Sequence, residues 1–243
     1  MRFKLEIALV LGLSLGKSAV YSIVSLITVL TSPSGLAGAK VTINRSVSAQ
    51  PVVDLIYQVL GIAFSLVPVA LCLYLLSDRG NPFKLIGFEA KPVAKNLVQG
   101  LSLAAAIGIP GLGLYLAARY LGLSAQIETS NLSAHWWTVP VLLLAAVGAA
   151  LLEEVIMVGY LFERLKQLGR SEWATIVISA SIRGSYHLYQ GFGGFVGNFI
   201  MGIAFGWAYR KLGRLTPLVV AHFVLDAVSF VGYAWAKTFI AGL

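Results

Sequence analysis

Long apolar runs separated by short polar gaps dominate the chain. A helix that crosses a bilayer needs about 20 largely apolar residues, and seven stretches come near this length. They are residues 5–31, 52–77, 94–121, 136–164, 172–188, 194–210 and 215–237. The pattern predicts an all-α fold, a polytopic bundle of about seven transmembrane helices.

Composition supports this prediction and narrows the class of partner. Hydrophobic residues make up 58% of the 243 positions and charged residues only 12%, whereas a soluble domain carries about 25% charged residues. The net charge of +8 would suit a nucleic-acid-binding protein, but the basic residues lie in the gaps between apolar runs. We therefore expect membrane lipids as partners and no nucleic acid.

The distribution of Lys and Arg predicts an orientation. Twelve of these residues lie before the first span or in the second, fourth and sixth gaps, and four lie in the other gaps or beyond. Because cytoplasmic loops carry the excess of positive charge, we expect the N-terminus in the cytoplasm and the C-terminus outside the cell membrane. Residues 1–130 would hold three spans and their loops, and residues 131–243 would hold four catalytic spans.

Several ionisable side chains lie inside the predicted spans. Each charge at the centre of a membrane helix costs on the order of 2.5–3.5 kcal/mol on insertion scales, so such residues are functional candidates. Six of the seven belong to the last four spans. The seven are Lys17, Glu153, Glu154, Arg183, His187, His222 and Asp226.

Two pairs among them have helical spacing. Arg183 and His187 are four residues apart, as are His222 and Asp226, so each pair shares one helix face. Such a face can place two polar groups toward the interior of a bundle.

Glu153 and Glu154 are adjacent and point about 100° apart on a helix. One can face a reaction centre while the other bonds to a neighbouring helix. A carboxylate beside an imidazole can hold and deprotonate a water, and a second imidazole can donate to an oxyanion. Two histidines and one glutamate are equally a zinc set, so the residue types leave both chemistries open.

The order of these groups resembles one family. Glu-Glu followed by Gly-Tyr, then a helix ending in His, then His-x-x-x-Asp in the last span is similar to the CPBP/Abi family. Its members are CAAX prenyl proteases and bacteriocin-processing or bacteriocin-immunity proteins, which are intramembrane endopeptidases. The resemblance covers about residues 145–230.

The resemblance implies a role for each matching residue. Glu153 would be the general base, His187 would position the water, and His222 with Asp226 would stabilise the oxyanion, while Glu154 would be an orienting partner. It also implies a glutamate-type peptidase, so we expect no cofactor and no catalytic metal. Zinc is the alternative, and Glu153, His187 and His222 would then be its ligands.

This sequence departs from the family pattern twice. Val158 stands where the first motif has arginine, and Arg183 stands where the second motif has an aromatic residue. Our hypothesis is that the positive charge has moved to the fifth span, where Arg183 neutralises Glu154 and keeps it ionised. The alternative is a degenerate, inactive member of the family.

These observations predict an intramembrane endopeptidase that hydrolyses a peptide bond at or near the bilayer, in a peptide or membrane protein. A catalytically inactive immunity or scaffold protein and a proton-coupled transporter are the alternatives. A transporter would more often show related halves or broken helices in corresponding positions, and the sequence shows neither. Substrate and oligomeric state are left open by the sequence.

Overall fold

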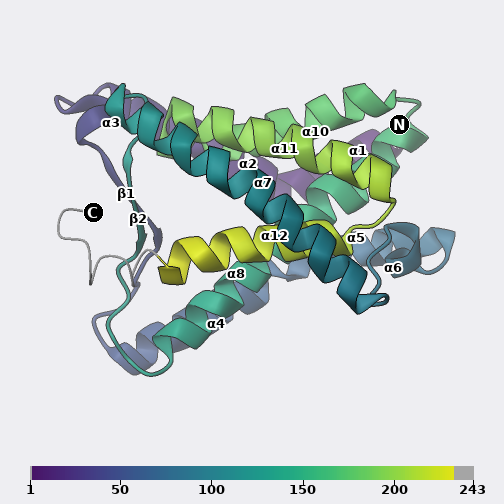
Figure 1. The fold of residues 1–243 in the computed structure, drawn as a ribbon, viewed down its shortest axis with the longest axis horizontal. Coiled ribbons are helices and arrows are strands. Elements are labelled where there is room, and N and C mark those ends of the chain that lie inside the picture. The colour runs from purple at the N-terminus through teal and green to yellow at the C-terminus, as the bar shows by residue number, and fades with distance from the viewer. Residues whose placement is uncertain (1, 233–243) are drawn as a thin grey trace.

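The structure is a computed structural model and describes residues 2–232. Figure 1 shows a helical bundle with two short strands at one end. In chain order the elements are α1 (Arg2–Leu13), α2 (Leu15–Leu30), α3 (Gly35–Gly38), β1 (Lys40–Asn44), α4 (Pro51–Ser65), α5 (Val67–Leu76), the 3-10 turn η1 (Ser77–Arg79), α6 (Pro82–Leu85), α7 (Val93–Tyr120), β2 (Gln126–Ser130), α8 (Thr138–Glu154), the π-helical segment η2 (Val155–Tyr160), α9 (Leu161–Gln167), α10 (Glu172–Tyr186), the 3-10 turn η3 (Leu188–Gln190), α11 (Phe192–Leu212), α12 (Thr216–Ala227) and the π-helical segment η4 (Val228–Gly232).

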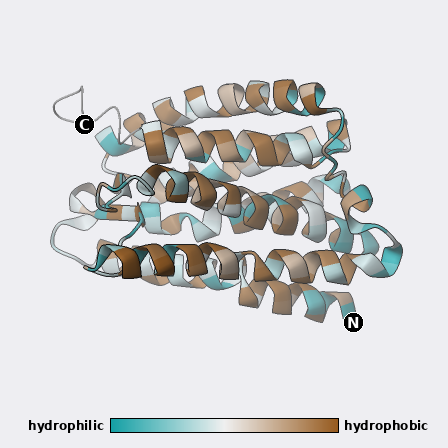
Figure 2. Ribbon diagram, turned by 90° about the horizontal axis from the view of Figure 1, so that it is seen from below, coloured by the Kyte–Doolittle hydropathy of each residue, from teal (hydrophilic) through white to brown (hydrophobic). Residues whose placement is uncertain are grey.

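The long helices run between two polar ends. One end holds the N-terminus and α6, and the other holds β1 and β2 (Figure 1). Figure 2 shows hydrophobic residues along the middle of the helices and hydrophilic ones near the ends. Exposed aromatic residues mark both ends, with Tyr120 91% and Trp136 83% exposed on one side and Trp173 53% exposed on the other. This banding is the one a bilayer selects.

Fewer helices are long enough to cross a membrane than the sequence predicts. Four have the required length and apolar character, namely Pro51–Arg79, Val93–Tyr120, Thr138–Gln167 and Phe192–Leu212, and α1 with α2 makes a fifth if the bent pair is one span. The helix α10 has 15 residues, and α12 with η4 is a shorter apolar helix. Seven spans are therefore not confirmed, and the predicted stretch beyond residue 232, with Lys237 and the C-terminus, lies outside the described residues.

The first predicted span is a bent pair of helices rather than one straight helix. Helices α1 and α2 meet at 55°. Ser14 Oγ donates to the Val10 carbonyl at 2.6 Å, and serine bonding back to its own helix bends it. A Cβ on Gly16 would lie 2.8 Å from the Leu11 carbonyl oxygen, so glycine is needed at the bend.

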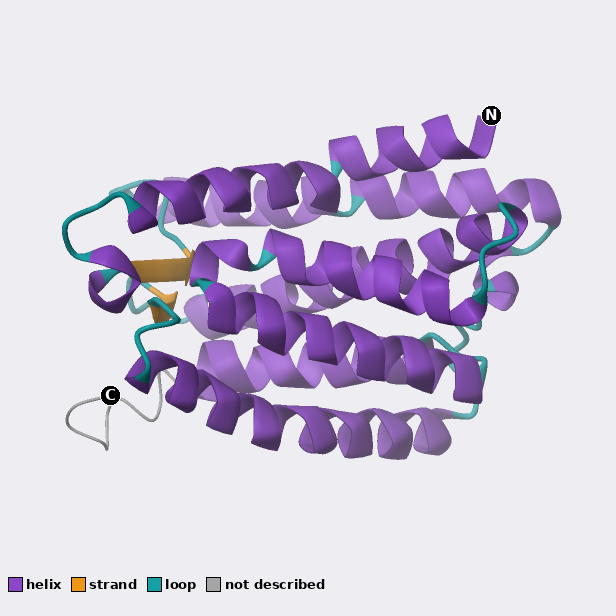
Figure 3. Ribbon diagram, turned by 90° about the horizontal axis from the view of Figure 1, so that it is seen from above, coloured by secondary structure: helices purple, strands orange, loops and turns teal. Residues whose placement is uncertain are grey.

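The two strands were not predicted. β1 pairs with β2 in parallel, with Lys40 opposite Gln126. Thr42 Oγ1 donates to Glu128 Oε2 at 2.8 Å, and Lys40 Nζ lies 3.1 Å from Glu128 Oε1. The all-α prediction thus needs a small correction, because the polar stretch after α2 and the one after α7 join in a two-stranded sheet (Figure 3).

Helix contacts decide where the polar residues meet. α10 packs against α11 and α2, and α12 packs against α7 and α8. A Cβ on Gly202 of α11 would lie 2.7 Å from Ala180 Cα of α10, which shows how closely these backbones approach, as small residues allow in membrane bundles. α8, α10 and α12 meet in the interior through their side chains, since Glu154 contacts both Arg183 and His222.

Candidate active site

The two glutamates end α8 at the point where the helix turns into η2. Glu153 is 9% exposed and Glu154 is fully buried. π-helical turns are rare in proteins, and those that occur are frequently found at functional sites. The helix α10 stabilises the π-helical segment η2, because Ser179 Oγ donates to the Met157 carbonyl at 2.8 Å.

Glu154 has one partner on each of two other helices. Its Oε1 accepts a hydrogen bond from Arg183 Nη2 at 2.7 Å and lies 2.7 Å from His222 Nδ1. Its Oε2 has no hydrogen-bond partner among the described residues. The contact between Arg183 and Glu154 that the sequence suggests is present, and Arg183 is 1% exposed.

Glu153 is held through one oxygen and faces a histidine with the other. Tyr186 donates its hydroxyl to Glu153 Oε2 at 2.6 Å, and Arg183 Nη1 lies 3.3 Å from the same oxygen. Glu153 Oε1 lies 3.9 Å from His187 Nε2. This separation is too long for a direct hydrogen bond, and one water can lie within hydrogen-bond distance of both atoms.

His187 follows the last residue of α10 and is its C-cap. Its Nδ1 lies 3.4 Å from the Gln190 side-chain nitrogen, and Gln190 also donates to the Tyr189 hydroxyl at 2.9 Å. The turn η3 is itself anchored, because the Ala125 N–H donates to the Gln190 carbonyl at 2.9 Å. His187 is thus positioned by a turn anchored to the chain before β2.

His222 lies between two carboxylates. Its Nδ1 contacts Glu154, and its Nε2 lies 3.6 Å from Asp226 Oδ2, four residues on along α12. The Phe205 ring from α11 meets the His222 ring edge-on at 6.3 Å and lies 5.5 Å from the Arg183 guanidinium carbon. The structure therefore brings all six predicted site residues into one cluster on α8, α10 and α12.

Sequence reasoning missed one residue of this cluster. Tyr186 is 4% exposed and contacts Glu153 directly. A signal existed, because Tyr186 precedes His187 and is three residues from Arg183, so it falls near the same face of α10. The residue type alone, a tyrosine in an apolar helix, nevertheless does not mark Tyr186 as a functional candidate.

Two other predicted intramembrane or interfacial cations lie elsewhere. Lys17 is exposed on α2 and takes no part in the cluster. Arg164 stands at the cytoplasmic end of the fourth predicted span and is one of the twelve basic residues expected on that side, yet it is 1% exposed. Its Nε lies 2.6 Å from Glu6 Oε1, and Tyr160 donates to the same oxygen at 2.9 Å, so this second buried network joins α1 to α9.

The donor atoms that lie nearest one another differ from the predicted zinc set. Among the described residues, Glu153, Glu154 and His222 offer ligand atoms within 4.8 Å of one another, whereas the predicted set had His187 in place of Glu154. The guanidinium of Arg183 contacts both carboxylates of this group. A fixed cation at this position opposes a second cation by direct repulsion, so the donor set fits zinc poorly.

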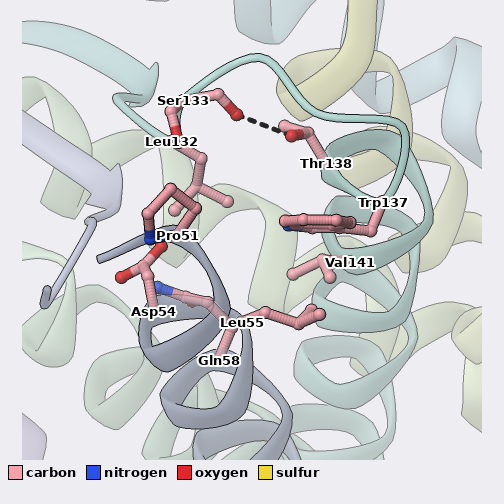
Figure 4. A pocket seen from close by; sticks show the side chains of 9 residues that line it. All are labelled: Pro51, Asp54, Leu55, Gln58, Leu132, Ser133, Trp137, Thr138 and Val141. Atoms are coloured by element: carbon pink, nitrogen blue, oxygen red, sulfur yellow. Dashed lines mark hydrogen bonds between the residues drawn. The ribbon is translucent and has the colours of Figure 1, made fainter. Parts of the chain in front are cut away.

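A small cavity lies away from the cluster, between the start of α4 and the start of α8 (Figure 4). Its volume is about 10 Å³, near the lower limit for one water. Its acid, Asp54, accepts from the Val47 N–H at 2.7 Å and from Ser46 Oγ at 3.1 Å. Asp54 therefore serves to hold the chain after β1.

Comparison with known proteins gives one family match. Residues 135–228, less than half of the chain, match the family model described as type II CAAX prenyl endopeptidase Rce1-like. No curated protein and no solved structure matches the chain.

The matched segment contains every element that contributes to the cluster, from the start of α8 to Asp226 on α12. Together with the apolar helices, the match indicates a multi-pass membrane protein. Such a family implies a peptide or protein substrate at the membrane. Residues 135–228 of this chain are therefore Rce1-like, which is consistent with the CPBP/CAAX protease family that the sequence motifs resemble.

Proposed function

We propose that the chain is an intramembrane endopeptidase of the glutamate type. The observation that carries the proposal is the pair of atoms Glu153 Oε1 and His187 Nε2, which face each other at 3.9 Å. A water between them would be held by both and would lose a proton to Glu153. The other oxygen of Glu153 is fixed by Tyr186, which leaves Oε1 as the base.

The chemical step balances with these groups alone. Water gives one proton to Glu153, and its oxygen attacks the carbonyl carbon of the substrate peptide bond. The resulting tetrahedral oxyanion collapses, the C–N bond breaks, and the proton held by Glu153 passes to the leaving nitrogen. General acid–base catalysis by a positioned side chain contributes about 10²–10⁴-fold in rate.

His222 is the proposed donor to the oxyanion. Its Nδ1 is engaged by Glu154 at 2.7 Å, and its Nε2 lies 3.6 Å from Asp226, too far for a hydrogen bond. Because Nδ1–H donates to the ionised Glu154, Nε2 carries a proton only in the imidazolium form. In that form Nε2–H is left to donate to the developing charge, where a preorganised donor is worth about 2.7–4 kcal/mol. Glu154 and Asp226 orient the ring.

Arg183 is the proposed counter-charge of the two glutamates. Adjacent buried carboxylates repel each other, and the guanidinium lies against both. It would take the place of the arginine that the family carries where this chain has Val158. The same guanidinium supports a mechanism without a catalytic metal, since its positive charge beside both carboxylates repels a second cation.

We further propose that the chain lies in the plasma membrane with its N-terminus in the cytoplasm. The polar end with α6 carries most of the basic residues, as the positive-inside rule requires of cytoplasmic loops. The match to an endopeptidase family does not favour a transporter or an inactive scaffold.

The test compares membrane and secreted peptides, by quantitative proteomics, from cells that carry wild-type protein or Glu153→Gln. Glu172→Gln is the matched control, because Glu172 is two-thirds exposed and pairs with Arg210 at the surface. We expect a set of peptides that depends on wild-type protein, persists with Glu172→Gln and disappears with Glu153→Gln. Identical peptide sets from wild type and Glu153→Gln, at equal protein levels, would contradict the proposed function.

A further inference from the structure

A cavity of about 290 Å³ lies beside the catalytic cluster, between α7, α11 and α12. Figure 1 shows α7 crossing α11 and α12 on this side of the bundle. The residues that line the cavity carry no charge, and those the argument uses are Gly111, Leu114, Gln190, Gly197, Met201 and Leu225.

The cavity is joined to the cluster through Gln190. The side-chain nitrogen of Gln190 lies 3.4 Å from His187 Nδ1, and Gln190 also lines the cavity. On the other side, Leu225 of the lining precedes Asp226. A substrate whose scissile bond lies at Glu153 and His187 would therefore pass next to this space.

Two of the glycines that line the cavity leave room for a side chain. A Cβ on Gly111 would meet no atom within 4 Å, and a Cβ on Gly197 would meet only Leu114 Cδ2 at 3.6 Å. Glycine inside a helix costs about 0.5–1 kcal/mol relative to alanine. These two glycines lower the helix propensity of α7 and α11, and the space they leave faces the cavity.

The size of the cavity decides what it can hold. At about 290 Å³, the space is far larger than the 10–15 Å³ that one water requires. The volume is also at the lower limit of sites for small molecules, about 300–1,000 Å³. It therefore has room for a large apolar side chain of a bound peptide.

We propose that this cavity is a specificity subsite that binds one large apolar side chain of the peptide substrate near the scissile bond. The assignment rests on the proposed peptidase function. Leu114, Met201 and Leu225 provide the apolar contacts, and the glycine backbone of α7 and α11 provides the room.

The test replaces glycines in the cavity wall with larger residues, whose side chains would fill the cavity. Gly111→Leu and Gly197→Leu each place a side chain in the space, and Gly197→Ala is a smaller change in case the leucine lowers the folded yield. Gly113→Leu is the matched control, because Gly113 lies on the same helix, meets no atom within 4 Å and does not line the cavity.

The measurement is cleavage-site profiling by mass spectrometry, with a defined mixture of synthetic peptides and purified protein in detergent. We expect wild type and Gly113→Leu to prefer Leu, Met or Phe at one position near the cut. In Gly111→Leu and Gly197→Leu, kcat/KM for those peptides should fall tenfold or more relative to peptides with Ala or Gly there.

Two outcomes overturn the proposal, and they can be told apart. If the filled variants cleave with the wild-type profile, or lose activity equally on all peptides, the cavity is not a side-chain subsite while the peptidase function stands. If wild type shows no cleavage that Glu153→Gln abolishes, the proposed function fails and the subsite fails with it.

Discussion

Arg183 donates from Nη2 to Glu154 Oε1 across 2.7 Å in the buried interior of the bundle. The pair joins α10 to α8, and the other terminal nitrogen of Arg183 lies 3.3 Å from Glu153. One guanidinium thus serves two adjacent carboxylates. It is the residue on which the local charge balance of the cluster depends.

Arg183→Ala should therefore destabilise the protein strongly. Removal of one partner from a buried ion pair costs about 3–5 kcal/mol, because the other charge is left uncompensated. We expect a large loss of folded protein and of proteolysis, read by thermal unfolding in detergent and by peptide cleavage.

The double variant Arg183→Ala/Val158→Arg tests whether the positive charge has moved between helices. It restores an arginine at the position where the family carries one, so folded yield and cleavage should recover in part. No recovery, or no loss in Arg183→Ala alone, would refute the relocation hypothesis.

Tyr186→Phe should lower activity without unfolding the protein. The change removes only the hydroxyl that donates to Glu153 Oε2 at 2.6 Å, and a hydrogen bond to a charged group contributes about 1.5–3 kcal/mol. We expect kcat/KM to fall roughly 10- to 100-fold, while the protein stays folded with an unfolding temperature lowered by several degrees. Wild-type kcat/KM in Tyr186→Phe would show that the hydroxyl does not orient the base. Tyr209→Phe is the control, because the Tyr209 hydroxyl donates to the Ile86 carbonyl, away from the cluster.

Asp226 should act through His222 rather than on the substrate. Asp226→Asn keeps an oxygen beside His222 Nε2, so we expect activity within a few-fold of wild type, whereas Asp226→Ala should lose tenfold or more. His222→Ala should lose more than either, because it removes the oxyanion donor, worth about 10²–10³-fold in kcat. The prediction is wrong if Asp226→Asn and Asp226→Ala lose activity equally.

Removal of metal ions should leave the activity intact. The guanidinium of Arg183 contacts both glutamates of the group that offers the closest ligand atoms, and this opposes a second cation. We expect purified, chelator-treated protein to hold far less than one zinc per chain by elemental analysis and to cleave at the untreated rate. Stoichiometric zinc, with activity lost on chelation and regained on zinc addition, would contradict this.

The pair of Glu6 and Arg164 should contribute to stability alone. Arg164 is 1% exposed, so Arg164→Leu leaves the partly buried Glu6 without its cation, with only the Tyr160 hydroxyl beside it, and should cost about 3–5 kcal/mol. Arg79→Leu is the comparison, since its pair with Glu163 is more exposed and is expected to contribute about 0–1 kcal/mol. Equal unfolding temperatures for the two variants would contradict the prediction.

Hydropathy predicted the helical class, because long apolar runs must fold as helices in lipid, but it did not predict the number of helices long enough to span the membrane. It also found six members of the cluster, since charged residues stand out in such runs. The sequence could not show the bend at Ser14, which depends on one side-chain bond, or the pairing of β1 with β2, whose strands are more than 80 residues apart. The role of Tyr186 and the π-helical segment η2 could not be predicted either, because neither differs in composition from an ordinary apolar helix.

The central claim is that Glu153 is the base of a peptidase. The most direct measurement is the cleavage rate of a peptide found by proteomics, with purified wild type, Glu153→Gln and Glu172→Gln in liposomes. The account predicts that Glu153→Gln loses about 10³-fold in kcat while its unfolding temperature and that of Glu172→Gln stay near wild type. Cleavage by folded Glu153→Gln at the wild-type rate would contradict it.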